Sequence, residues 1–347
     1  MKLFRIFIAF LTFFGFSLAS PLKSDEHVIF IPDIAYLDEN NSLQVNIQAW
    51  IYEKEWRPGL TTLLVKYIDV DKSKLSKTEY DRLYYMTSLF KIDSEDGKEF
   101  KVKFENGQVF DMPKTREGGR SSLLAKLDTK NFLDTQKEKI INFSVFNSTA
   151  TSADNGVAYY FAPFGYAVIS DIDDTIKDSK VLDKKELLRN TFVNEFKAVS
   201  GMSDFFKSIK KPNTITSFHY VSSSPIQLYP ALQEFIDKNG FPKGSFHLKE
   251  LTDWDNILFV DSFMYKIVSI RKIINAYPKR EFILVGDSGE KDPEIYTQIS
   301  KEFVGNVARI YIRDVTNEDI NSTRFKELTK DLKDTKFTVF KESEVKF

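Results

Sequence analysis

The densest group of chemically capable side chains lies at residues 170–176, with the sequence Ser-Asp-Ile-Asp-Asp-Thr-Ile. It places Asp171, Asp173 and Asp174 within four residues, directly after the apolar segment 166–169. Burying such charges costs several kcal/mol each unless a cation compensates them. In an extended chain Asp171 and Asp173 point to the same side. The pattern predicts a divalent metal site in which one acid attacks and the other handles a proton. An acidic turn capping the next helix is the alternative.

A second acidic segment, Gly-Asp-Ser-Gly-Glu-Lys-Asp at 286–292, also follows an apolar strand candidate, residues 282–285. Asp287 would therefore emerge at a strand end, beside the first cluster if the two strands are neighbours. Lys266 lies 21 residues before Asp287 and could neutralise a carboxylate–phosphoryl pair. Arg271 and Lys272 compete for that role.

A third segment, Tyr220-Val221-Ser222-Ser223-Ser224-Pro225, brings hydroxyl groups to the end of another strand candidate. The hydroxyl of Ser222 could bind a phosphoryl oxygen. Ser223 and Ser224 are equally well explained as N-cap residues for a helix that begins near Ile226.

The elements that must position these residues alternate between buried strands and amphipathic helices. This alternation predicts an α/β fold, a doubly wound parallel sheet that binds ligands at the carboxyl ends of its strands. Expected strands are 166–170, 214–221, 282–285 and 307–312, and expected helices are 184–199, 203–210, 226–238 and 266–277.

The region before residue 162 has strand-like patterns instead. Residues 43–52 alternate apolar and polar side chains at period two, and Asn106-Gly107 is a strong hairpin turn signal. We expect a β-rich N-terminal domain, a sandwich with a helical insertion over 73–91. Other expected strands are 99–104, 109–112, 140–146 and 156–161. The predicted division is a signal peptide at 1–19, the β-rich domain at 20–162 and the α/β domain at 163–347.

The amino-acid composition excludes several kinds of partner and metal site. The 347 residues contain 49 Lys and Arg against 50 Asp and Glu, a net charge of −1, which argues against a nucleic-acid partner. Cysteine is absent, which excludes disulfides, thiolate nucleophiles, iron–sulfur clusters and Cys-based zinc sites. The three histidines, His27, His219 and His247, are scattered. Any metal should therefore be a hard ion bound by oxygen.

The first residues predict export. A basic start at Lys2 and Arg5 precedes the apolar segment 6–18, and Ser17 and Ala19 supply small residues for a cleavage site. We expect cleavage after Ala19 and a periplasmic or extracellular destination. A single N-terminal anchor helix is the alternative.

Taken together, these motifs resemble the haloacid dehalogenase superfamily, and more closely the catalytic domain of the actin-patch-protein phosphatidate phosphatase family. The matching stretches cover most of residues 166–315, in the expected order. They are DIDDTIK (171–177), FHYVSSSP (218–225), FPKGSFHL (241–248), ILVGDSGEKDPEIY (283–296) and RIYIRDV (309–315).

The resemblance implies roles for individual residues. Asp171 would attack phosphorus and form an aspartyl-phosphate, and Asp173 would act as acid and then base. Mg²⁺ would be held by the Asp171 carboxylate, the Asp173 backbone carbonyl and Asp287. The substrate-binding residues would be Ser222, Lys266 and Thr175, and Asp292 would orient Lys266 or the metal's waters.

The spacing between the motifs indicates the size of the substrate. The intervals 175–222 and 225–266 leave no room for a large cap domain, so an open site and a bulky substrate are expected. The preferred prediction is a secreted phosphatase acting on phosphatidate or a related phospholipid, with membrane-surface contact. A soluble or protein-borne phosphoester, or a non-catalytic binding protein, are the alternatives. The basic segment 177–190 is interpreted as a solvated helix face.

Overall fold

The computed structural model describes residues 20–55, 59–129, 132–147, 150, 152–153, 155–210, 215–250 and 262–341. The predicted signal peptide lies outside these residues. Within the described part of the chain, no helix has the length and apolar character needed to cross a membrane.

The N-terminal region is β-rich, as expected. Ten strands form one continuous sheet instead of the two separate sheets of a sandwich, because β12 pairs with β3 on one side and with β10 on the other. Phe30, Phe104 and Phe143 join the apolar core that this sheet encloses. The sheet strands are β2 (Glu26–Ile31), β3 (Asp33–Leu37), β4 (Leu43–Lys54), β5 (Ile92–Ser94), β7 (Lys101–Phe104), β8 (Val109–Asp111), β9 (Arg120–Leu127), β10 (Lys139–Phe146), β11 (Ser152–Ala153) and β12 (Gly156–Tyr160), while β1 (Ser20–Pro21) pairs with β6 (Lys98–Glu99).

The helical insertion lies between β4 and β5. It contains α1 (Leu60–Tyr67), the short 3-10 helix η1 (Lys72–Lys74) and α2 (Lys77–Ser88), where one helix over 73–91 was predicted. The chain is extended at Leu75, and α2 begins with a capping box between Ser76 and Glu79, which separates η1 from α2.

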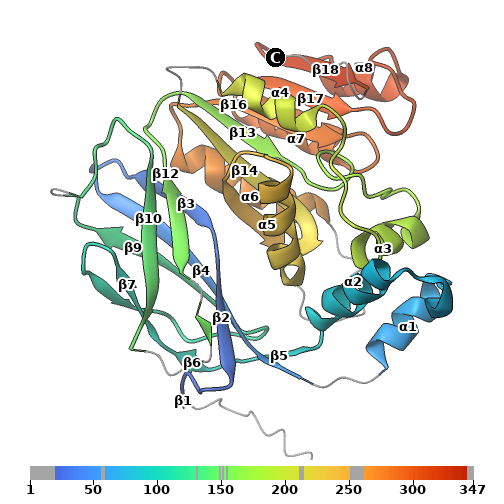
Figure 1. Cartoon of the computed structure of the whole chain (residues 1–347). Helices are drawn as coiled ribbons and strands as arrows, with labels where there is room; N and C mark the ends of the chain where they lie inside the picture. Colours follow the sequence, from blue (N-terminus) through green and yellow to red (C-terminus); the bar gives the residue numbers. More distant parts are fainter. Residues whose placement is uncertain are drawn as a thin grey trace, which may run out of the picture.

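Six parallel strands form the second sheet, in the order β15-β14-β13-β16-β17-β18. The predicted parallel sheet is therefore confirmed, and Figure 1 shows it beside the N-terminal strands. Its strands are β13 (Tyr166–Ser170), β14 (Thr216–Pro225), β15 (Ser245–Lys249), β16 (Glu281–Asp287), β17 (Val307–Arg313) and β18 (Lys336–Phe340).

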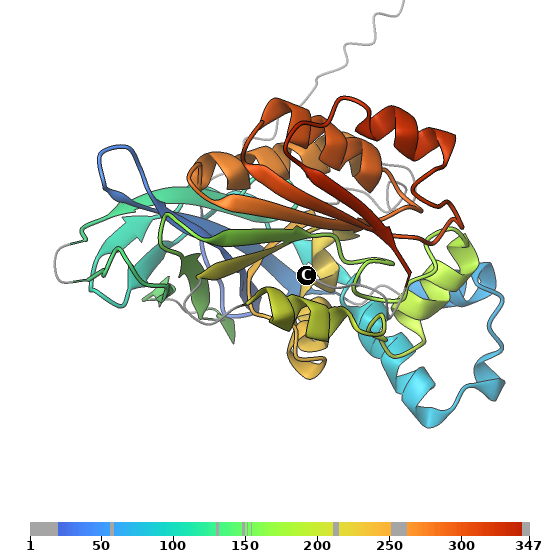
Figure 2. The ribbon, with the colours of Figure 1, turned by 90° about the horizontal axis from the view of Figure 1, so that it is seen from above.

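Helices cover both faces of this sheet, as Figure 2 shows from above. One face packs its apolar side chains against α4 and α5, and the other packs against α6, α7 and α8. The helices are α3 (Lys184–Phe192), α4 (Met202–Ile209), η2 (Ile226–Leu228), α5 (Tyr229–Lys238), α6 (Ser262–Ala276), α7 (Asp292–Glu302) and α8 (Thr323–Thr329).

The helix predicted over 184–199 ends early, at Phe192. Residues after it instead hydrogen-bond to the loop that follows β13: Asp178 donates to the Lys197 carbonyl at 2.9 Å and Val199 to the Ile176 carbonyl at 2.9 Å. These tertiary hydrogen bonds replace the last helical turns.

The two regions share an extensive boundary. The Phe246 amide at the free edge of β15 donates to the Pro32 carbonyl at 2.9 Å, and the Tyr277 hydroxyl donates to the Ala35 carbonyl at 2.9 Å. The insertion also packs on α3, where the rings of Phe90 and Phe192 lie 5.4 Å apart. The N-terminal region therefore contacts β15, the end of α6 and α3, which surround the candidate functional residues of the second sheet.

A buried His-Ser-His chain near this boundary predicts acid sensitivity. Ser245 lies 2.8 Å from Nδ1 of His219 and 2.9 Å from Nε2 of His247. Burial lowers the pKa of His247 to about 4. Because the unfolded chain binds a proton near pH 6.5 and the folded chain does not, stability should fall as the pH drops from about 6.5 to about 4, by about 3 kcal/mol from this group.

Urea unfolding between pH 7 and pH 4 tests this. His247→Gln should reduce the loss of unfolding free energy between pH 7 and pH 4. His27→Gln, at a half-buried ring stacked on Tyr52, should leave that loss unchanged. Equal pH slopes in wild type and His247→Gln would contradict the prediction.

Candidate active site

Three neighbouring strands bring the predicted residues to one edge of the parallel sheet. Asp171 follows β13, Ser222 lies in β14, and Asp287 ends β16. The order β14-β13-β16 puts β13 in the middle, and carboxyl ends of parallel strands share one edge. The local fold therefore gathers residues that are far apart in sequence.

Three carboxylates form a buried cluster at this edge. Asp171, Asp287 and Asp292 each offer an oxygen within 4.8 Å of the others, and none is more than 1% exposed. Burial raises the pKa of all three, and the neighbouring negative charges add to this effect against the opposing influence of Lys266. The negative charge of the three carboxylates is therefore only partly balanced.

Lys266, from α6, is the buried cation in contact with this cluster. Its Nζ lies 2.9 Å from Oδ1 of Asp171, 2.7 Å from Oδ1 of Asp292 and 3.1 Å from Oε2 of Glu290. One ammonium thus faces Asp171, Asp292 and Glu290, with Asp287 in the same acidic cluster. Glu290 was not singled out from the sequence, although it lies within the 286–292 motif.

The cluster fits a hard divalent cation. Oδ2 of Asp171 and Oδ2 of Asp287 are both buried and have no hydrogen-bond partner. Buried carboxylate oxygens without donors are costly, and Mg²⁺ prefers such ligands. Asp292 belongs to the same group, and its Oδ1 accepts from Lys266 at 2.7 Å. The orienting role expected for it stays a prediction.

The carboxylate of Asp173 is not part of this cluster and has other partners. Its Oδ1 accepts hydrogen bonds from Lys177 and Ser179, each at 2.6 Å, and its Oδ2 accepts from Ser224 at 2.6 Å. Burial alone would raise its pKa, but Lys177 and these hydrogen bonds outweigh burial and lower it to about 2. The side chain is held ionised.

Lys177 corrects one interpretation of the sequence. The basic segment 177–190 was expected to be a solvated helix face, but Lys177 precedes α3 and is only 2% exposed. Its position four residues after Asp173 is the signal that was available. Ser224, considered as a helix cap, also contacts Asp173.

The third acid of the motif has a structural role. Asp174 adopts a left-handed backbone conformation with φ of 53°, and its carboxylate accepts from the amides of Ser179, Lys180 and Val181 at 2.7–2.8 Å. These bonds fix the loop that carries Asp173 and Lys177.

The predicted substrate-binding residues are buried at the same place. The hydroxyl of Ser222 lies 3.5 Å from Oδ2 of Asp173 and accepts from the Ser224 amide at 3.0 Å. Oγ1 of Thr175 is buried and has no hydrogen-bond partner. The competitors of Lys266 lie elsewhere: Arg271 pairs with Glu302 and Lys272 with Asp33.

Sheet and site together define an α/β domain with buried carboxylates and a lysine at the carboxyl edge of a parallel sheet. Residues 166–314 match the family model described as "Phosphatidate phosphatase APP1, catalytic domain". The resemblance drawn from the motifs is thereby confirmed.

The chain is also similar to two curated proteins. The chain is 34% identical over 200 residues to phosphatidate phosphatase APP1 of Saccharomyces cerevisiae, covering 56% of this chain and 34% of that protein. It is 30% identical over 158 residues to an uncharacterized protein of Schizosaccharomyces pombe, covering 44% of this chain and 26% of that protein. The chain thus spans about a third or less of these relatives.

The carboxylate cluster predicts a thermal response to metal. Millimolar Mg²⁺ should raise the melting temperature by several degrees. A ligand at about 100 times its Kd adds about 2.7 kcal/mol to the free energy of unfolding. Asp287→Asn should weaken the apparent Mg²⁺ affinity in this titration at least about tenfold, because it removes one of the two carboxylate oxygens that have no hydrogen-bond donor.

Differential scanning fluorimetry with a Mg²⁺ titration measures this. Asp331→Asn, at an exposed acid in an ion pair with Lys301, is the matched control. A Mg²⁺ response that Asp287→Asn leaves intact would place the metal elsewhere.

Proposed function

We propose that this chain is a Mg²⁺-dependent phosphatase of the haloacid dehalogenase type, acting on phosphatidate or a related phospholipid phosphomonoester. One observation carries the proposal. Asp171, at the end of the central strand β13, has one oxygen paired to Lys266 and its other oxygen buried without a partner beside Asp287. A phosphatidate phosphatase with 34% identity supports the substrate class.

The proposed reaction has two steps. In the first, an Asp171 oxygen bonds to phosphorus, the bond from phosphorus to the leaving alcohol oxygen breaks, and that oxygen takes a proton from Asp173. In the second, water gives a proton to Asp173 and attacks phosphorus, which releases phosphate and restores Asp171.

The surroundings of Asp173 bear on both steps. Lys177, Ser179 and Ser224 keep its carboxylate ionised, which is the state that accepts a proton from water. Before the first step it must be protonated, and the negative charge of a bound phosphate raises the pKa of a carboxylate beside it. Lys266 and Ser222 would hold the phosphoryl oxygens.

Metal binding would fall to Asp171 and Asp287, with the backbone carbonyl of Asp173 as the expected third ligand from the protein. When bound, Mg²⁺ neutralises the negative charges that meet when a carboxylate approaches a phosphate. Lys266 already supplies part of that neutralisation, because it contacts Asp171 directly.

The proposed domains are a phosphatase domain at 163–347 and a β-rich domain at 20–162, after a signal peptide at 1–19. Within its described residues, the connection from β13 to β14 contains α3 and α4 and no further helix or strand, which supports an open site and a bulky substrate. Export predicts that the secreted protein begins at Ser20, and N-terminal sequencing that finds Met1 would contradict it.

The test is phosphate release by the purified chain from Ser20 onward, with Mg²⁺, from phosphatidate in mixed micelles and from a small aryl phosphate. Release from phosphatidate that EDTA abolishes is the expected result. Release from the aryl phosphate alone would keep the mechanism and reject the lipid. No release from either would contradict the proposed function.

A further inference from the structure

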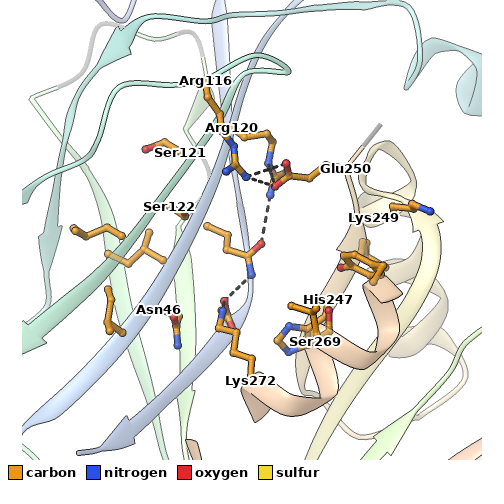
Figure 3. A pocket seen from close by; sticks show the side chains of 18 residues that line it. Asn46, Arg116, Arg120, Ser121, Ser122, His247, Lys249, Glu250, Ser269 and Lys272 are labelled. Atoms are coloured by element: carbon orange, nitrogen blue, oxygen red, sulfur yellow. Dashed lines mark hydrogen bonds and ion pairs between the residues drawn. The ribbon is translucent and has the colours of Figure 1, made fainter. Parts of the chain in front are cut away.

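A pocket outside the candidate active site lies between the N-terminal sheet and the α/β domain. It has a volume of about 570 Å³ and is lined by β4 and β9 on one side and by β15 and α6 on the other. This volume is within the range of about 300–1,000 Å³ typical of small-molecule sites. Figure 3 shows Arg116 and Arg120 converging on Glu250 at one end, and Lys272 with His247 at the other.

Arg120 is the unusual residue of this pocket. It is only 4% exposed, yet its Nε and Nη1 are buried without a hydrogen-bond partner. Nη2 donates to Oε1 of Gln48 at 3.4 Å, and the nearest carboxylate oxygen, Oε1 of Glu250, lies 3.6 Å from Nε. Burial lowers the pKa of Arg120 to about 10, and Arg116 adds to this effect against Glu250. Buried guanidinium groups normally have their donors satisfied.

The two carboxylates of the pocket are already engaged by other groups. Glu250 accepts two hydrogen bonds from Nη2 of Arg116, at 2.7 and 2.9 Å. Asp33 accepts from Lys272 at 3.0 Å and from Gln48 at 2.6 Å. Among the charged side chains that line the pocket, Arg116, Arg120, Lys249 and Lys272 outnumber Glu250 and Asp33. The ion pair that Arg120 forms with Glu250 is 3.6 Å long, and Arg116 already engages that carboxylate.

We propose that this pocket binds a phosphate ester, with Arg120 as the residue that holds its phosphoryl group. A phosphoryl group offers several acceptor oxygens to the unsatisfied donors of an arginine. The volume exceeds what a phosphate ion alone requires. Leu124 and Val268, which line the pocket and are 50% and 59% exposed, supply apolar contacts for an organic part of the ligand.

This site is separate from the catalytic edge, but it shares helix α6 with it and includes β15, which pairs with the catalytic strand β14. Consecutive residues of α6 serve both: Tyr265 lines the pocket, and Lys266 contacts Asp171. In the sheet, Leu248 lines the pocket and pairs with Ser222. The ligand would therefore bind against the elements that position the candidate catalytic residues. The chemistry suits either the head group of an anionic phospholipid or a soluble organic phosphate.

The test measures binding in an Asp171→Asn background, so that no probe is hydrolysed. Glycerol 3-phosphate is titrated by calorimetry, and phosphatidylcholine vesicles with and without phosphatidate are used in co-sedimentation. Adding Arg120→Gln should weaken binding about tenfold or more, because a charge-assisted contact is lost. Adding Glu250→Gln should tighten it several-fold, because Arg116 is released and a repelling charge disappears.

The catalytic edge is the same in these paired variants, so a difference in their binding affinity reports on the pocket around Arg120 alone. Arg309→Gln, at an arginine of β17 that does not line the pocket, is the matched control and should change nothing. Arg120-dependent binding of glycerol 3-phosphate supports a soluble ligand, and Arg120-dependent binding of phosphatidate vesicles alone supports a lipid.

Binding curves that neither variant shifts would overturn the proposal. If Arg120→Gln fails to fold, Glu250→Gln decides alone, and unchanged affinity rejects the site. The binding experiment requires no turnover. If the wild-type chain releases no phosphate but the Asp171→Asn chain binds through Arg120, the proposed phosphatase is refuted and the proposal for this pocket stands.

Discussion

Replacing Asp171 with Asn is expected to reduce phosphate release by roughly 10⁴-fold or more, because an amide cannot act as the attacking oxygen nucleophile. The same change should leave the fold intact. Asn has nearly the same shape, and it removes one negative charge from the crowded cluster of Asp171, Asp287 and Asp292. Steady-state phosphate release and the melting temperature are the two measurements.

Asp183→Asn is the matched control for this variant. Asp183 caps α3 by accepting from the amides of Lys185 and Glu186, and Asn caps a helix equally well. The control should keep nearly full activity. If Asp171→Asn retained more than about a tenth of the wild-type rate, Asp171 would not be the nucleophile.

Replacing Lys266 with Met should damage both activity and stability. We expect activity to fall about 10²–10³-fold, because the charge that meets the phosphoryl oxygens is lost. Removing the buried partner of Asp171 and Asp292 should also cost about 3–5 kcal/mol of unfolding free energy near pH 7. Added Mg²⁺ should restore part of the stability, because it compensates the same carboxylates.

Lys301→Met tests whether any lysine-to-methionine change has this effect. Lys301 is exposed and forms a long ion pair of 3.7 Å with Asp331, so its loss should change stability by less than about 0.5 kcal/mol. Urea unfolding and phosphate release are measured for both variants. Equal losses from Lys266→Met and Lys301→Met would show that Lys266 has no special position.

Local patterns were enough to predict the elements that carry the site. The strand over 166–170 coincides with β13, because an unbroken apolar run followed by acids is typical of a buried parallel strand. The alternation over 43–52 likewise predicts β4, whose buried and half-buried residues alternate from Leu43 to Ala49. Each of these signals lies within a single short segment.

Features that depend on distant contacts could not be predicted. Lys177 is buried because Asp173 and the ring of Phe196 surround its ammonium group, which no local charge count reveals. Helix α3 ends at Phe192 because tertiary hydrogen bonds compete with its last turns. The N-terminal strands form one sheet because β12 joins its two halves, a pairing between segments far apart in sequence.

The pocket around Arg120 illustrates the same limit. Arg120 lies on β9 and Lys272 on α6, and the sequence alone gives no reason to bring them to one cavity. Lys272 was considered for the catalytic site, yet it pairs with Asp33, a residue 239 positions away. Only the packing of the N-terminal sheet against α6 explains its position.

The most direct test of the proposed mechanism is to trap the phosphorylated protein. The chain is mixed with substrate labelled in its phosphate, quenched in acid, and digested for mass spectrometry. The account predicts an acid-stable, hydroxylamine-sensitive label on the peptide that contains Asp171, absent from Asp171→Asn. Label on another residue, or rapid turnover without any labelled protein, would contradict the assignment of Asp171 as the nucleophile.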